Sequence, residues 1–265
     1  MSRHGGSGTE EVRRNAHADW DRWPVEDYLE ENYRRLYACD AAVIRHHSAY
    51  CRPLPAGSVA EALELGCGPN LYPLMILAAA SGRIDAVEPG AAGYAYLRRQ
   101  LHHGPEASWQ PFYDLCRRLN PALPASLSTA LERVRPLHGD VSQVRQYRYG
   151  LGSMTFVAES VTEDGAEFAA LCRAFLGCIR PGGGVLAAFM ENMPSYRIGE
   201  GPLWPAFPVD APAVREVFAP HTDRLVVRRV PKDPALPDYG HTGMLLLSGT
   251  RRSDADVPQL VIGSR

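Results

Sequence analysis

The stretch Ala62-Leu-Glu-Leu-Gly-Cys-Gly-Pro-Asn70 and the later stretch Ile84-Asp-Ala-Val-Glu88 decide the fold of this 265-residue chain. Together they predict a strand, a glycine turn, a helix and a second strand that ends in an acid. Gly66 and Gly68 lack a Cβ, so the backbone can turn sharply and approach a ligand closely, while the free N–H groups of the following helix face that ligand. Glu88 comes 20 residues after Gly68, where a carboxylate can accept hydrogen bonds from both ribose hydroxyls. The two stretches predict a pocket for a nucleotide-like cofactor.

The residues after the glycine turn argue against a dinucleotide. A dinucleotide fold usually places a third glycine near position 71, and this chain has Leu71-Tyr72 there. A Glu-x-Gly-x-Gly turn with an acid at the next strand tip resembles the class I methyltransferases that use S-adenosylmethionine (SAM). The resemblance implies SAM as the cofactor; another nucleotide and a purely structural turn are the alternatives.

Composition and charge narrow the class of protein. A chain of this length with 45% hydrophobic residues can bury a full core and form one elaborated domain. The net charge is −2 and the Arg-Arg pairs are scattered among acids, so no basic stripe predicts a nucleic-acid partner. The longest apolar run, residues 71–80, contains Pro73 and is far shorter than the roughly 20 residues that span a bilayer.

The amino-terminal residues show no apolar signal core. We therefore expect a cytoplasmic protein, a monomer or weak homodimer, whose partner is a small molecule and not a membrane. The six cysteines include no Cys-x-x-Cys pair, which favours reduced, buried thiols.

The order of patterns predicts a doubly wound α/β sheet of seven strands in one domain, residues 20–251, between a disordered tail (1–19) and a carboxy-terminal tail (252–265). Helical spacing in residues 25–50 predicts two helices ahead of the sheet, and we expect residues 20–50 to form a lid. The expected strands are residues 59–65, 83–87, 135–138, 154–158, 185–190, 225–230 and 243–248, the last two antiparallel. The expected helices are residues 69–80, 91–102, 127–134, 166–179 and 209–218, with residues 105–124 an irregular insertion.

Two constellations fit a ligand or a structural role. On a regular helix Tyr28 and Tyr33 lie about 140° apart, so both can face one ligand only if that helix ends or bends; alternatively, Tyr33 and Tyr37 form a packing stripe. Asp140 closes the third strand, where its carboxylate can accept a hydrogen bond from an adenine amino group while Val141 covers the ring, or it is a turn residue.

A third constellation, Ser195-Tyr196-Arg-Ile-Gly199-Glu200, follows the fifth strand on the rim where open α/β sheets bind ligands. Glu200 fits a cationic amine there, or it is a solvated loop acid. The adjacent pairs His46-His47 and His102-His103 lack zinc-site spacing, and we expect no metal.

Taken together, these segments resemble the nicotinamide, phenylethanolamine and indolethylamine N-methyltransferases from Trp23 to Arg251. The matching segments are Asp27-Tyr28-Leu-Glu-Glu-Asn-Tyr33, Gly66-Cys-Gly-Pro-Asn-Leu-Tyr72, Ser108-Trp109-Gln-Pro111, Asp140-Val141, Tyr196-Arg-Ile-Gly-Glu200 and Gly243-Met-Leu-Leu-Leu.

The resemblance implies a set of site residues. The tyrosines would bind the methionine carboxylate of SAM, Glu88 would bind its ribose, and Asp140 and Val141 would contact its adenine. The implied cofactor residues are Tyr28, Tyr33, Gly66, Cys67, Gly68, Asn70, Tyr72, Glu88, Asp140, Val141 and Ala158. The implied acceptor residues are Glu200 as the catalytic group and Tyr196, Glu163 and Asp238 as substrate contacts.

Departures from the family keep some assignments open. The acid after the fourth strand is Glu159 or Glu163. The family's acid before the last strand has no unambiguous counterpart, with Asp238 and His241 both near. Glu88-Pro89 replaces the family's Asp-Tyr. Phe189 stands where the nicotinamide enzyme has a substrate-binding aspartate, which argues against nicotinamide.

The expected reaction is an in-line SN2 displacement on a sulfonium methyl group, in which holding the acceptor lone pair against the methyl group does most of the work. An aliphatic amine with a pKa near 10 is mostly protonated at pH 7, and Glu200 is the candidate for accepting the proton. The sequence favours methylation of an amine or heteroaromatic nitrogen. A small-molecule O-methyltransferase and a non-catalytic SAM-binding protein are the alternatives.

Overall fold

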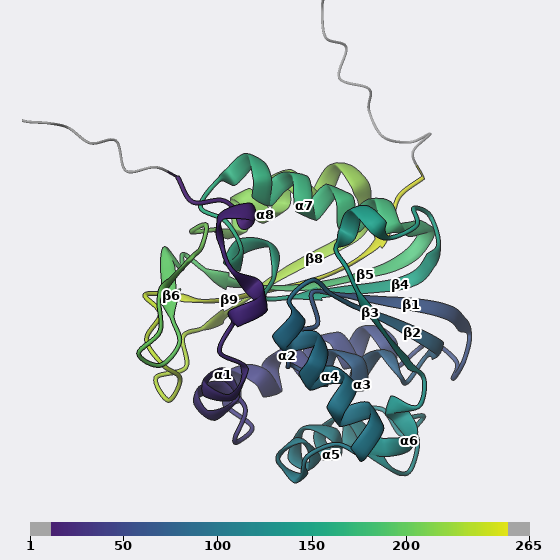
Figure 1. Cartoon of the computed structure of the whole chain (residues 1–265). Coiled ribbons are helices and arrows are strands. Elements are labelled where there is room, and N and C mark those ends of the chain that lie inside the picture. Colours follow the sequence, from purple (N-terminus) through teal and green to yellow (C-terminus); the bar gives the residue numbers. More distant parts are fainter. Residues whose placement is uncertain (1–11, 254–265) are drawn as a thin grey trace, which may run out of the picture.

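The computed structural model describes residues 12–253 around one seven-stranded sheet (Figure 1). Its strands are β1 (Val59–Leu65), β2 (Ser81–Glu88), β3 (Val134–His138), β4 (Tyr149–Thr155), β5 (Ile179–Glu191), β8 (Thr222–Pro231) and β9 (Gly243–Arg251). The spatial order is β3-β2-β1-β4-β5-β9-β8. The strands from β3 to β5 are parallel, and β9 is antiparallel to both β5 and β8. The predicted seven-stranded sheet with an antiparallel last pair is confirmed.

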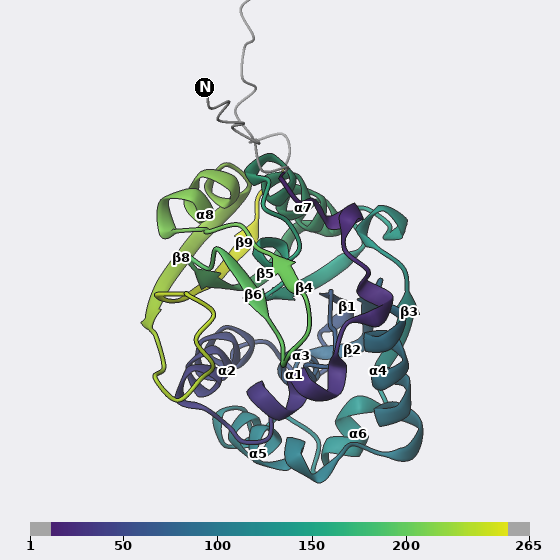
Figure 2. The same ribbon diagram turned by 60° about the vertical axis from the view of Figure 1, so that its left-hand side comes forward.

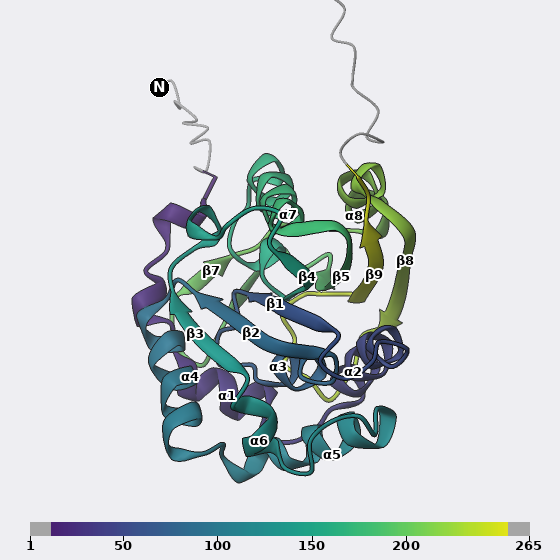
Figure 3. The same ribbon diagram turned by 90° about the vertical axis from the view of Figure 1, so that its right-hand side faces the viewer.

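Helices cover both faces of this sheet (Figures 1 and 3). The α-helices are α1 (Val25–Asn32), α2 (Ala38–Cys51), α3 (Tyr72–Leu77), α4 (Ala91–His103), α5 (Gln110–Leu119), α6 (Leu127–Leu131), α7 (Gly165–Cys178) and α8 (Ala211–Phe218). The 3₁₀ helices are η1 (Asn15–His17), η2 (Trp20–Arg22), η3 (Ala107–Trp109), η4 (Val141–Gln143), η5 (Ala158–Ser160) and η6 (Ala219–His221). Helices α7 and α8 pack on one face and α2 to α6 on the other, each over its own buried cluster. The sheet is therefore doubly wound, as the alternating pattern predicts. None of the helices in the described range is long and apolar enough to cross a membrane.

The burial of each strand follows its place in the sheet. The last four residues of β1, at the centre, are all buried, which is typical of a parallel strand covered on both faces. Strand β8, at the edge, alternates between exposed and partly buried positions along much of its length. On the other side of β1 from β8, Asp85 of β2 is buried and accepts hydrogen bonds from Arg135 of β3 (2.8 and 2.7 Å) and from the Tyr149 hydroxyl of β4 (2.9 Å). Burial alone would raise the pKa of Asp85, but the hydrogen bonds from Arg135 and Tyr149 outweigh it and the pKa is lowered.

Several predicted elements differ from the structure in their bounds or type. Strand β4 ends at Thr155, not residue 158, because Phe156 takes a positive φ of 58° that no strand continues. The helix expected at 69–80 is confined to α3. The insertion at 105–124 contains the regular helix α5, whose Phe112 and Cys116 are fully buried. A two-stranded hairpin of β6 (Ser195–Arg197) and β7 (Leu203–Pro205) was not predicted.

The predicted amino-terminal tail is too long. Residues 12–19 contain η1 and pack on the domain, where the Arg13 backbone and guanidinium donate to Glu163 (2.9 and 2.8 Å). Residues 1–11 and 254–265 lie outside the described residues. Arg252, expected in the carboxy-terminal tail, donates to Asp223 at 2.8 Å.

Candidate cofactor site

A cavity of about 330 Å³ opens where the carboxyl ends of β1 and β4 meet. The chain leaves β1 toward β2 on one side, while β4 lies on the other. This is the topological switch point, the place where open α/β sheets bind ligands. Leu65 and Gly66 line the cavity from the end of β1, and Thr155, Phe156 and Val157 line it from the end of β4.

The turn after β1 requires its first glycine for two reasons. Gly66 has a φ of +66°, a conformation that favours glycine. A Cβ at this position would lie 2.7 Å from Val157 Cγ1 and 2.8 Å from Cγ2. Gly68 also has a positive φ, +48°, but a Cβ there would meet no atom within 4 Å. The loop therefore packs its backbone against Val157 at Gly66 and leaves open space at Gly68.

Glu88 organises the glycine loop from the tip of β2. Its Oε2 accepts from the Gly68 N–H at 2.8 Å, and its Oε1 accepts from the Gly90 N–H at 2.9 Å. Burial raises the pKa of Glu88, although these two hydrogen bonds oppose the shift. Each carboxylate oxygen has two lone pairs, so Glu88 keeps acceptor capacity for a ligand in the cavity, which it lines.

Tyr28 and Tyr33 converge because α1 ends between them. The helix stops at Asn32, and Tyr33 leaves it with φ −132°. The two hydroxyls are 3.2 Å apart and both residues line the cavity. Burial raises the pKa of Tyr28 to about 12, so its hydroxyl stays protonated and can donate. The helix therefore ends between the two tyrosines, which is the condition for both to face one ligand. Tyr33 is also a packing residue, with its ring centroid 5.5 Å from that of Trp109.

Asp140 and Val141, which follow β3, both line the cavity. Asp140 caps η4, accepting from the Ser142 N–H at 2.6 Å. The capping role and the ligand role are compatible, because a carboxylate has further lone pairs. Cys67 and Asn70, from the glycine loop, also line the cavity.

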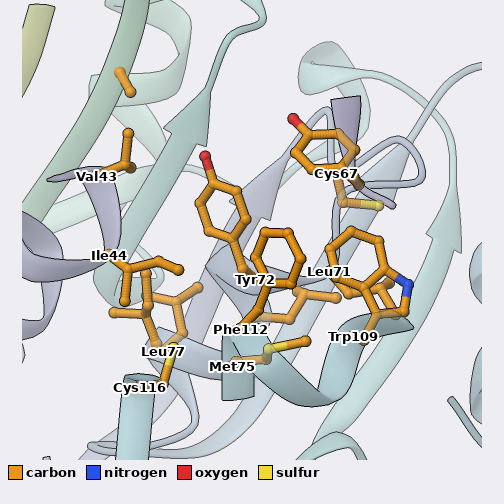
Figure 4. Close-up of a cluster of buried hydrophobic side chains, with 14 of the residues drawn as sticks. Val43, Ile44, Cys67, Leu71, Tyr72, Met75, Leu77, Trp109, Phe112 and Cys116 are labelled. Carbon is orange, nitrogen blue, oxygen red and sulfur yellow. The ribbon is translucent and has the colours of Figure 1, made fainter. Parts of the chain in front are cut away.

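Two of the predicted cofactor residues are not part of the lining. Tyr72 is fully buried and stacks on Phe112, with ring centroids 6.0 Å apart and planes 6° apart (Figure 4). Ala158 is fully buried in the apolar cluster under α7. Tyr72 follows the glycine loop and Ala158 follows β4 at the expected spacing, but both side chains pack in the hydrophobic core.

Three predicted acceptor residues are also absent from the lining, for physical reasons that the structure shows. Glu200 lies exposed in the turn of the β6–β7 hairpin. Glu163 is held by Arg13. Asp238 has a side chain 72% exposed and pairs with Lys232 at 2.5 Å. Tyr196 does line the cavity, with its hydroxyl donating to the Ser160 carbonyl at 3.2 Å.

The alternatives for these acids are buried beside the cavity and do not line it either. Glu159 is fully buried, its Oε1 accepts from the Met190 N–H at 2.8 Å, and its Oε2 lacks a partner among the described residues. His241 is buried, which lowers its pKa.

Several lining residues were missed by the sequence reasoning. From α1 and α2 come Asn32 and Asp40, and from the end of β4 comes Phe156. The other missed residues that line the apolar side are Met190, Met193, Leu236, Tyr239 and Met244. Asp40 carried a usable signal, since it is a lone acid in the apolar run from Cys39 to Ile44. The methionines carried none.

The amino-terminal segment runs across the domain from beside α7 to α4 (Figure 2), and its residues Asn15, Trp20 and Trp23 line the cavity. At one end, the Asn15 N–H donates to Glu167 of α7 at 3.2 Å. At the other end, Asp21 accepts from the Ala91 N–H at the start of α4, at 2.8 Å. Between them Trp20 lines the cavity and stacks on Trp204, with ring centroids 5.1 Å apart. Residues 12–24 therefore cover the strand ends from α7 to α4.

The charge of the lining is one-sided. Of the residues in the described range that form its wall, Asp40, Glu88 and Asp140 are acids, and none is lysine, arginine or histidine. No group of three or more described His, Cys, Asp or Glu side chains is placed to hold a metal ion. The described wall therefore offers acids that can pair with a cationic group and no basic side chain that would repel one.

Comparison with known proteins agrees on the fold. The N-methyltransferase NodS from Bradyrhizobium japonicum WM9, solved with S-adenosyl-L-homocysteine, superposes with a TM-score of 0.52 and 13% identity over 89% of this chain and 100% of that one. A SAM-dependent methyltransferase from Leishmania major gives a TM-score of 0.53 and 12% identity over 88% of this chain and 80% of its own. At such identities the likeness shows the fold alone: this chain has the Rossmann-like fold of class I methyltransferases. No protein-family profile and no curated protein matches the sequence, so membership of the nicotinamide and phenylethanolamine N-methyltransferase family stays a prediction.

Proposed function

We propose that this protein is a SAM-dependent methyltransferase that acts on a small-molecule acceptor. The observation that carries the proposal is the cavity at the switch point, walled by three acids and no basic side chain among the described residues. SAM has a sulfonium, an ammonium and one carboxylate, and so a net positive charge; this wall has acids that can pair with its cationic groups and no basic side chain to repel them. The pyrophosphate of a dinucleotide would meet acids there without a compensating cation, in addition to lacking the third glycine.

The residues around the cavity fit the parts of SAM. Glu88 has acceptor lone pairs for the ribose hydroxyls, and Asp140 with Val141 suits an adenine edge and face. The glycine loop brings backbone close to the ligand at Gly68, where open space remains. The paired hydroxyls of Tyr28 and Tyr33 would donate to the methionine carboxylate. When bound, SAM supplies an electrophilic methyl group on its sulfonium.

The other side of the cavity supports a nitrogen acceptor with an apolar body. Its wall comes from Met190, Met193, Met244 and Leu236, together with Tyr196. An apolar wall disfavours a charged ammonium and lowers the pKa of a bound amine, which favours the neutral form that has a lone pair for attack. With Glu200 outside the lining, these residues would promote the reaction by desolvating and positioning the acceptor.

A methyl-transfer screen with labelled SAM tests the proposal. The acceptors would be arylalkylamines, heteroaromatic nitrogens and phenols, with Glu88→Ala as the inactive control. Transfer to an amine or heteroaromatic nitrogen is the expected result. Transfer only to phenols would make the protein an O-methyltransferase and overturn the nitrogen assignment. SAM binding without turnover on any of the three classes would favour a non-catalytic SAM-binding protein.

A further inference from the structure

Asp40 is a buried acid in the wall of the cavity. It lies in the first turn of α2, is 3% exposed, and is part of the cavity wall. Its Oδ2 has no hydrogen-bond partner among the described residues. An unpaired buried carboxylate oxygen costs free energy, so such a group in a cavity indicates a ligand that pairs with it.

Two other buried acids resemble Asp40 but do not line the cavity. Glu64 of β1 and Glu159 of η5 each have an oxygen without a partner in the described part of the chain, and burial raises the pKa of Asp40, Glu64 and Glu159 alike, to about 8. Of these three, Asp40 alone is among the residues that line the cavity. The other lining acids, Glu88 and Asp140, already accept backbone hydrogen bonds.

The surroundings of Asp40 indicate which ligand group it meets. Asp40, Tyr28 and Tyr33 line the same cavity. Burial raises the pKa of both tyrosines, and the charge of Asp40 adds to the rise. Two hydroxyl donors beside a free carboxylate acceptor complement an amino-acid group, whose carboxylate accepts and whose ammonium donates. Glu88 and Asp140 stand at the nucleotide side, which leaves Asp40 as the lining acid at the tyrosine side.

We infer that Asp40 binds the α-ammonium group at the amino-acid end of the cofactor. This inference rests on the proposed function, since it takes SAM as the ligand. It adds a residue from α2 that neither the glycine loop nor the strand-tip motifs specify.

Proton release is a direct consequence. Burial raises the pKa of Asp40, the Tyr37 backbone N–H opposes the shift, and the charge of Asp233 adds to the rise. The Asp40 carboxyl is therefore mostly protonated at pH 7. An ammonium beside it favours the carboxylate, so binding should release a proton from Asp40 to the buffer.

Calorimetry with two ligands tests the contact. S-adenosylhomocysteine carries the amino-acid group, and 5′-methylthioadenosine keeps the nucleoside and the thioether without it. We expect Asp40→Asn to weaken S-adenosylhomocysteine roughly 10- to 100-fold, the effect of losing a hydrogen bond to a charged group, and to leave 5′-methylthioadenosine within twofold. Asp233→Asn is the matched control, because Asp233 accepts from the Ala38 N–H at 3.1 Å at the start of α2 but is not in the cavity wall; it should leave both affinities within about threefold.

Repeating the titrations in buffers of different ionisation enthalpy measures the proton. Wild type should release more protons with S-adenosylhomocysteine than Asp40→Asn does, a difference that a purely structural role of Asp40 would not produce. Equal weakening of both ligands, or unchanged S-adenosylhomocysteine affinity in Asp40→Asn, would overturn the inference while leaving the proposed function intact. If the wild-type protein bound neither ligand, the proposed function would fail first.

Discussion

Replacing Gly66 by alanine tests how the glycine loop is built. The variant places a side chain at φ +66°, which costs an L-residue about 1–2 kcal/mol. Its Cβ would also lie 2.7 Å from Val157 Cγ1, and forcing such an overlap in a packed site typically costs about 1–3 kcal/mol. We therefore expect Gly66→Ala to lower the free energy of unfolding by about 2–5 kcal/mol in total.

Gly68→Ala supplies the matched comparison, because its φ is also positive and a Cβ there meets nothing within 4 Å. Urea denaturation should show a loss of only about 1–2 kcal/mol for this variant. Adding Val157→Ala to Gly66→Ala should recover the steric part, giving a coupling of about 1–3 kcal/mol in a double-mutant cycle. Equal losses for the two glycine variants, with no coupling to Val157, would refute this view of the loop.

Four further predictions concern the ligand, the cover and the sheet. Tyr28→Phe and Tyr33→Phe should each weaken S-adenosylhomocysteine roughly tenfold in calorimetry and spare 5′-methylthioadenosine; weakening of both ligands would assign the tyrosines a packing role instead. Hydrogen exchange should show residues 20–50 better protected with ligand than without, and identical protection would exclude a lid that orders on binding. Glu200→Gln should leave turnover of the identified acceptor within twofold, since the side chain is exposed away from the cavity wall; a large loss would return Glu200 to the site. Asp85→Asn should destabilise the fold by roughly 1.5–3 kcal/mol at pH 7. Because the folded pKa of Asp85 is lowered, its contribution is present above the ordinary value of 3.8 and lost as the pH falls through the folded value, so a denaturation series in pH should show the difference from wild type shrinking in acid; a constant difference would contradict the ion-pair explanation.

The sheet and the part of the cavity wall formed by the glycine loop, Glu88 and Asp140 could be predicted because their signals are local. The glycine loop, Glu88 and Asp140 each follow a strand directly, and the carboxyl ends of parallel strands share one edge of the sheet. The sequence also predicted when Tyr28 and Tyr33 could converge: a regular helix would separate them, whereas a helix that ends between them brings them together.

The apolar side of the cavity could not be predicted in the same way, because contacts between residues far apart in the sequence determine it. Glu163 matches the expected spacing, but Arg13, 150 residues earlier in the chain, takes its carboxylate. The wall formed by Met190 and Met244 depends on the pairing of β5 with β9, in which these two residues are directly opposite. Phe156 ends β4 early through a backbone conformation that its residue type does not predict.

Ligand binding by the wild-type protein tests the central claim, a SAM pocket at the switch point, most directly. Calorimetry with S-adenosylhomocysteine and with NAD, under the same conditions, compares the two cofactor classes in one experiment, and Glu88→Ala checks that binding occurs in the described cavity. We predict binding of S-adenosylhomocysteine, at least tenfold weaker in Glu88→Ala because hydrogen bonds to a carboxylate are lost, and no binding of NAD. Tight binding of NAD, or S-adenosylhomocysteine affinity that does not depend on Glu88, would contradict the claim.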